Sequence, residues 1–89
     1  MDREEAAWLE AVGELLGIDA GLDDESKRVL LRVTKVTADA TGIRYLAPLT
    51  AYLVGFAAGR AEANGDTFDL LAAARAISER AAGWAPPPG

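Results

Sequence analysis

The sequence predicts an all-α fold, a compact antiparallel bundle of four helices. Apolar residues recur at helical spacing along most of the chain, and nowhere do they alternate strictly as in a half-buried strand. Glycines and acidic residues interrupt this pattern where helices end and begin, and the short loops that result favour antiparallel neighbours. A chain of 89 residues is long enough for one domain. We place that domain at residues 1–84 and a Pro-rich C-terminal tail at residues 85–89.

The first helix is expected at about residues 3–16. Its apolar stripe consists of Trp8, Leu9, Val12, Leu15 and Leu16. Two glutamates lie on the opposite side, and Gly17 is expected to end the helix in a left-handed conformation.

The second helix is expected at about residues 24–41, between an N-cap at Asp23 or Asp24 and a stop at Gly42. Its inner stripe consists of Val29, Val33, Val36 and Ala40. This helix is rich in β-branched residues, which have weak helix propensity, so we expect packing to supply its stability.

The third helix is expected at about residues 48–63, with Pro48 as its first residue because the missing N–H of proline costs nothing there. It would end at Asn64-Gly65. The fourth helix is expected at about residues 67–82, with Asp66 as its N-cap and Gly83 as its stop.

The third helix has a small-residue ridge, with one Ala or Gly at every fourth position. The ridge consists of Ala47, Ala51, Gly55, Gly59 and Ala63. Each interior Gly costs about 0.8–1 kcal/mol relative to Ala in a helix, which implies a compensating close approach by another helix. We expect packing within the chain, against the alanines of residues 72–76. A homodimer seam and a groove for a ligand or partner are the alternatives.

The composition offers little catalytic chemistry. The chain has no Cys and no His, which removes thiolate chemistry, the commonest general base and the commonest transition-metal ligand. Paired carboxylates stand at expected helix starts, where the helix dipole explains them. A Ca²⁺ site over residues 19–25 is a weaker alternative. We therefore expect no enzyme, no metal and no cofactor.

The charge and hydropathy patterns bear on the class of partner and on the cellular compartment. A net charge of −5 argues against nucleic acid, whose binding depends on neutralising phosphates. The acidic start differs from a signal peptide, and the longest apolar stretch, about 15 residues, is shorter than a membrane span. A soluble, cytoplasmic protein is expected.

Two candidate binding sites emerge from the residues. One is an anion or ligand site at the start of the third helix, formed by Arg44, Tyr45 and Thr50 with free backbone N–H groups. The other is a partner surface on the second helix. It consists of Arg28, Leu31, Arg32 and Lys35. This stripe is either a docking surface for an acidic partner or a solvated face paired with acids of the first helix.

Several segments carry a family resemblance. They are Trp8-Leu9, residues 15–18, the stretch APLTAYLVGFAAG at residues 47–59, and Trp84. Together they resemble a small bacterial helical domain family of unknown function. Its members occur alone or appended to proteins of molybdopterin-guanine dinucleotide biosynthesis. The resemblance implies an accessory role near molybdenum-cofactor assembly or its client oxidoreductases, and it brings no catalytic residues.

These observations favour a non-enzymatic protein-interaction module that binds a molybdenum-cofactor pathway protein, with a homodimer as a further alternative. The competing interpretation is a small-molecule domain that binds an anionic cofactor or nucleotide at the start of the third helix.

Overall fold

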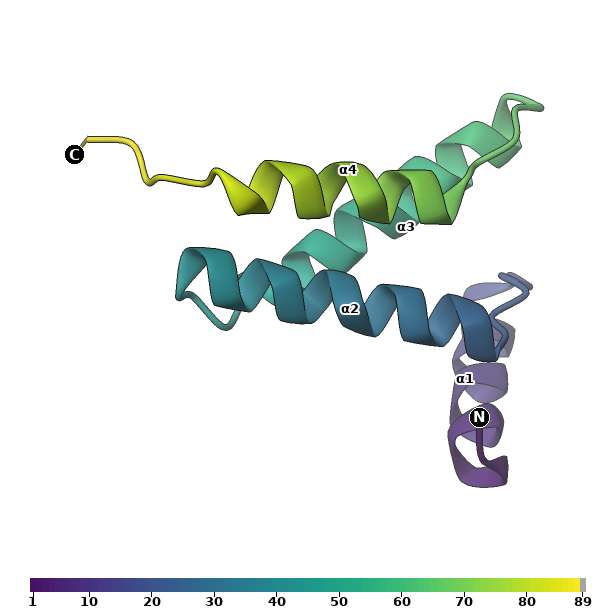
Figure 1. Ribbon diagram of the computed structural model, residues 1–89. Coiled ribbons are helices and arrows are strands. Elements are labelled where there is room, and N and C mark those ends of the chain that lie inside the picture. Colours follow the sequence, from purple (N-terminus) through teal and green to yellow (C-terminus); the bar gives the residue numbers. More distant parts are fainter. Residues whose placement is uncertain (89) are drawn as a thin grey trace.

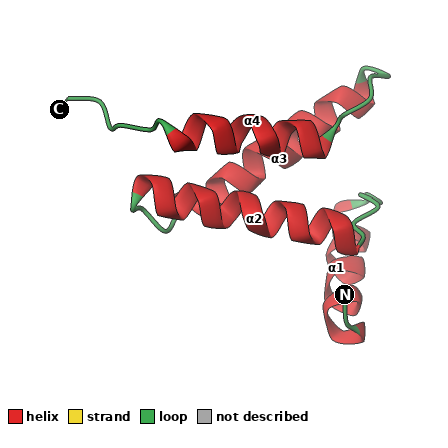
Figure 2. Ribbon diagram, viewed as in Figure 1, coloured by secondary structure: helices red, strands yellow, loops and turns green. Residues whose placement is uncertain are grey.

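The structure, a computed structural model, describes residues 1–88, which form four α-helices and no strand (Figures 1 and 2). The helices are α1 (Arg3–Leu16), α2 (Asp24–Thr41), α3 (Leu46–Ala63) and α4 (Leu70–Ala82). The predicted all-α class is confirmed, and α1 and α2 have the predicted bounds. Gly89, the last residue of the predicted tail, lies outside the described residues.

Local sequence explains the bounds of the first two helices. The Asp2 carboxylate accepts a hydrogen bond from the Glu5 N–H at 2.8 Å, and Asp23 accepts one from the Ser26 N–H at 2.8 Å. Asp23 rather than Asp24 is therefore the N-cap of α2. Gly17 and Gly42 end the two helices with φ values of 68° and 69°, a conformation that glycine adopts without a steric penalty.

Helix α3 begins at Leu46, two residues earlier than predicted. The N–H groups of Leu46 and Ala47 donate to the carbonyls of Ile43 and Arg44, each at 3.1 Å, and this tight turn extends the helix toward its N-terminus. Pro48 is consequently the third residue of the helix and not the first. It is tolerated there because the early N–H groups of a helix lack partners in any case.

Helix α4 begins at Leu70, and its N-cap is Asp69, which accepts a hydrogen bond from the Ala72 N–H at 3.0 Å. The prediction of Asp66 as N-cap was wrong. The N–H of Asp66 instead donates to the Ala61 carbonyl at 2.8 Å and so belongs to the turn that ends α3. The residues that follow are not helical, and among them Phe68 packs against the core.

Helix α2 is the centre of the packing. It contacts both α3 and α4, whereas α3 and α4 meet over only a short stretch. The core is small: among the described residues the buried hydrophobic side chains are Val33, Val54 and Ala74, one from each of these helices. Partly buried neighbours surround them, namely Val29, Leu30, Phe68, Leu70 and Ile77. The core thus joins three helices.

The packing is consistent with a bundle, but the predicted antiparallel arrangement of four helices is not confirmed. Figure 1 shows α2 and α4 side by side and running in the same direction, with α3 crossing behind them. Helix α1 packs against none of the other three helices and projects from the start of α2. An apolar stripe predicts that one face of a helix is buried against another surface. It does not identify that surface.

Candidate functional site

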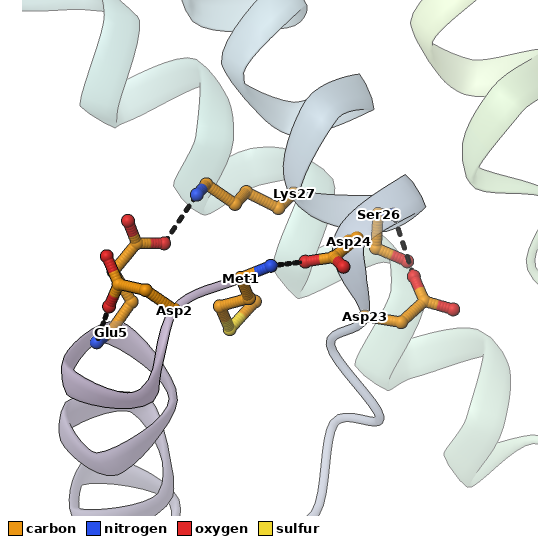
Figure 3. Close-up of polar contacts among 7 residues, drawn as sticks. All are labelled: Met1, Asp2, Glu5, Asp23, Asp24, Ser26 and Lys27. Atoms are coloured by element: carbon orange, nitrogen blue, oxygen red, sulfur yellow. Dashed lines mark hydrogen bonds and ion pairs between the residues drawn. The ribbon is translucent and has the colours of Figure 1, made fainter.

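The junction of α1 and α2 brings together acidic residues from the starts of both helices, namely Asp2, Glu5, Asp23 and Asp24 (Figure 3). The Met1 ammonium binds the Asp24 carboxylate, and the Lys27 ammonium binds Glu5. The hydrogen bond from the Met1 ammonium lowers the pKa of Asp24, and the hydrogen bond to Glu5 raises the pKa of Lys27. These two ion pairs connect α1 and its N-terminal residue to the start of α2.

The acidic stretch at residues 19–25 does not converge on a cation site. Asp19 accepts a hydrogen bond from the Gly21 N–H at 3.1 Å, Asp23 caps α2, and Asp24 binds the Met1 ammonium. Within residues 1–88, no three His, Cys, Asp or Glu side chains are grouped so that they can hold a metal ion.

The predicted anion site at the start of α3 has fewer donors than the sequence suggested. Arg44 and Tyr45 are exposed, as expected. The Leu46 and Ala47 N–H groups, however, donate to loop carbonyls, and Pro48 has no N–H. Most of the donors that normally make a helix start attractive to anions are therefore engaged or missing. Anion binding here stays an untested prediction.

Thr50, the third residue of that predicted site, lies away from Arg44 and Tyr45, in a separate notch of about 280 Å³ formed by α2, α3 and the end of α4. Its hydroxyl donates to the Leu46 carbonyl at 2.8 Å. At the rim of the notch, the Arg80 guanidinium stacks on the Trp84 ring at 5.0 Å from the ring centroid. Trp84, which sequence reasoning used only for the resemblance, thus lines the notch together with Arg80.

The small-residue ridge of α3 is open. Gly55 and Gly59 are exposed, and a Cβ atom added at either position would meet no other atom within 4 Å. The prediction that α4 covers the ridge was wrong, because α3 meets α4 over only a short stretch and directs Val54 into the core instead. Ala51 is half-buried and Ala63 is exposed. The homodimer alternative for this ridge stays untested.

Two apolar surfaces that the sequence did not single out as sites are exposed. The α3 outer face consists of Tyr45, Leu49, Tyr52, Leu53 and Phe56, which are 53–68% exposed. The α1 stripe consists of Trp8, Leu9, Leu15 and Leu16, and Leu15 reaches 85% exposure. The sequence contains a signal for the α3 outer face, because residues 46–59 have no charged side chain. A helix that is apolar on all sides is normally buried on all sides.

The predicted partner surface on α2, which we call the α2 outer face, consists of Arg28, Leu31, Arg32 and Lys35, and all four are exposed. Lys35 pairs with Asp39 at 2.7 Å, one turn further along α2. Among residues 1–88, neither Arg28 nor Arg32 has a carboxylate within salt-bridge distance. The lysine that pairs with the acids of α1 is Lys27, outside this face. Leu31, 56% exposed, is an apolar residue at the margin of this basic stripe.

None of the four helices combines the length and apolar character that crossing a membrane requires, as far as residues 1–88 show. Comparison with curated proteins gives no match, and comparison with solved structures gives none either. A sequence profile of a domain of unknown function, DUF6457, matches residues 2–88, which is nearly the whole chain. The chain therefore belongs to the DUF6457 family, a family of domains of unknown function.

Proposed function

We propose that this domain is a non-enzymatic protein-interaction module that acts as an accessory in molybdenum-cofactor biosynthesis or for its client oxidoreductases. The observation that carries the interaction role is the amount of apolar surface left open: three hydrophobic side chains are buried, while whole faces of α1 and α3 are exposed. Soluble domains rarely expose such contiguous apolar faces unless these bind something.

The α2 outer face is the proposed docking site for an external partner. Arg28 and Arg32 lack carboxylate partners within the described residues, and guanidinium groups bind carboxylates in a two-pronged geometry. Leu31 supplies an exposed apolar side chain at the margin of the same face. A partner with acidic side chains around an apolar pocket would match this arrangement, because interface centres combine apolar anchors with Arg.

The molybdenum-cofactor context rests on the resemblance of residues 47–59 and the flanking motifs to domains appended to molybdopterin-guanine dinucleotide biosynthesis proteins. The family match covers the same residues and assigns a domain of unknown function. The context is therefore a separate part of the proposal from the docking face.

The test is affinity capture from the native host with the wild-type chain and with Leu31→Glu. We expect the wild type to retain a molybdenum-cofactor pathway protein, and the variant to lose it because a buried carboxylate disrupts an interface. The matched control is Leu71→Glu, since Leu71 is 47% exposed on α4, outside the α2 outer face.

The two parts of the proposal fail separately. Recovery of no cofactor-pathway protein would refute the context. Equal capture by wild type and Leu31→Glu would refute the α2 outer face as the docking site.

A further inference from the structure

A single copy of the chain exposes more surface than a folded domain of its mass ordinarily does. Its accessible surface is 7024 Å², whereas the scaling for folded monomers gives about 5000 Å² for 9.3 kDa. The radius of gyration is 14.4 Å, against about 12 Å expected for a compact chain of this length. The detached α1 and the extended residues after Gly83 both contribute to an excess of about 2000 Å².

Most of the large apolar side chains on this surface belong to two regions. Of the fifteen that are exposed, six lie in α1 and the linker that follows it, and five form the α3 outer face. On α3 the rings of Tyr52 and Phe56 lie 6.2 Å apart and form a continuous aromatic surface. A single copy therefore leaves two separate apolar regions unburied, one on α1 and its linker and one on α3.

The two regions are complementary in charge. Helix α1 carries four glutamates and one arginine. Residues 43–63, which include all of α3, carry two basic residues, Arg44 and Arg60, and one acidic residue, Glu62, so the net charge is 2 − 1 = +1. An acidic helix with an apolar stripe thus matches a neutral-to-basic helix with an apolar outer face.

We infer that a second copy of the chain covers the α3 outer face with its α1 stripe, and that the contact is reciprocal. Such a contact is a twofold interface, in which each copy contributes one arm and one receiving face. Because the residues after Gly83 account for part of the excess surface, the contact buries at most about 2000 Å² per copy, or about 4000 Å² in total, and this upper bound lies within the range of obligate homodimers. The inference deepens the proposed interaction function by naming one partner, and it leaves the α2 outer face free.

The position of α1 favours a second copy over cover within one chain. Figure 1 shows α1 projecting from the start of α2, and α1 makes no packing contact with α3. The ion pairs of Met1 with Asp24 and of Glu5 with Lys27 hold it at that end of α2 (Figure 3). Leu15, the most exposed large hydrophobic residue of α1, is 85% exposed and thus open to another molecule.

The first test is sedimentation of the wild type and Leu15→Glu. We expect the wild type at twice 9.3 kDa and the variant to raise the dissociation constant by about 30-fold or more, as an interface hot spot does. Because Leu15 is 85% exposed in a single copy, the helical content of the variant should be unchanged by circular dichroism. Leu31→Glu is the matched control and should remain dimeric. A wild type that is monomeric up to millimolar concentration would overturn the inference.

The second test locates the contact without depending on stability. The chain has no cysteine, so Leu15→Cys and Phe56→Cys can be mixed as two single-cysteine proteins. Because a disulfide needs Cα atoms within about 7 Å of each other, a flexible bismaleimide is used to join the two thiols. We expect a cross-link between unlike copies, and none when Leu31→Cys replaces Leu15→Cys. A dimer without that cross-link, or a monomer with both cysteines that cross-links only within its own chain, would overturn the reciprocal arrangement. Loss of the external partner with Leu31→Glu, by contrast, tests the α2 outer face alone.

Discussion

Lys27 of α2 donates a hydrogen bond to the Glu5 carboxylate of α1 and so bridges two helices that do not otherwise pack together (Figure 3). Both side chains are substantially exposed, 35% for Lys27 and 43% for Glu5. Exposed ion pairs contribute little to global stability, because water and salt screen them. This pair therefore orients α1 more than it stabilises the fold.

Lys27→Gln should accordingly loosen α1 without affecting the bundle. In the monomeric Leu15→Glu background, we expect faster amide hydrogen exchange in α1 and an unchanged thermal midpoint for the rest of the chain. Lys35→Gln is the control, because the Lys35–Asp39 pair lies within α2. Unchanged exchange in α1 after Lys27→Gln would mean that other contacts hold the helix.

Stability should fall at both extremes of pH. Hydrogen bonds from backbone N–H groups lower the pKa values of Asp2 and Asp23 below 3.8. The two ionised carboxylates therefore contribute to the free energy of unfolding above pH 3.8. This contribution is lost as the pH falls through the lower folded-state pKa values. Hydrogen bonds to carboxylates raise the pKa values of Lys27 and Lys35 above 10.5, so their contribution is present below 10.5 and lost as the pH rises through the folded-state values.

Helical content measured by far-ultraviolet circular dichroism should consequently be constant between about pH 5 and 9 and decline beyond each side. Asp23→Asn is an informative comparison, because asparagine can still cap α2 but does not titrate. The decline in acid should become shallower in this variant. An identical acid profile would show that Asp23 does not contribute to it.

The start of α4 gives a prediction of measurable size. Asp69→Ala removes the observed N-cap and should lower the free energy of unfolding by about 1 kcal/mol. Asp66→Ala should change it by less than about 0.5 kcal/mol, because the Asp66 carboxylate caps nothing in the described structure. Urea denaturation of the two variants measures both values. A larger loss of unfolding free energy for Asp66→Ala than for Asp69→Ala would show that Asp66 is the N-cap, as the sequence predicted.

Local rules explain what the sequence could predict. The bounds of α1 and α2 follow from single residues, such as the left-handed Gly17 and Gly42 and the cap at Asp23. The start of α3 was missed because a tight turn, in which the N–H groups of Leu46 and Ala47 donate to the carbonyls of Ile43 and Arg44, extends the helix beyond Pro48. The start of α4 was missed because two aspartates compete for the N-cap. Asp66 and Asp69 have equal capping propensity, and the packing of Phe68 against the core selects the second.

The candidate surfaces show the same limit. Sequence pattern identified Leu31 and its flanking arginines as an exposed stripe, and all of them are exposed. The pattern also gave α1 and α3 apolar faces, but it assigned both to the interior of one bundle. Periodicity reports that a face is apolar and carries no information about whether the same chain or another molecule covers it. The open faces of α1 and α3 were therefore found only from the structure.

The open ridge of α3 provides the last prediction. Gly55→Ala in the Leu15→Glu background should raise the free energy of unfolding by about 0.5–1 kcal/mol, because alanine favours the helix and its Cβ enters open space. Gly42→Ala is the control and should lower it by about 1 kcal/mol or more, since Gly42 has a φ of 69°. Urea denaturation gives both values. A loss of stability in Gly55→Ala would mean that another helix of the same chain packs on the ridge, as the sequence predicted. The apolar surface that α3 leaves exposed would then be smaller than the proposed dimer interface requires.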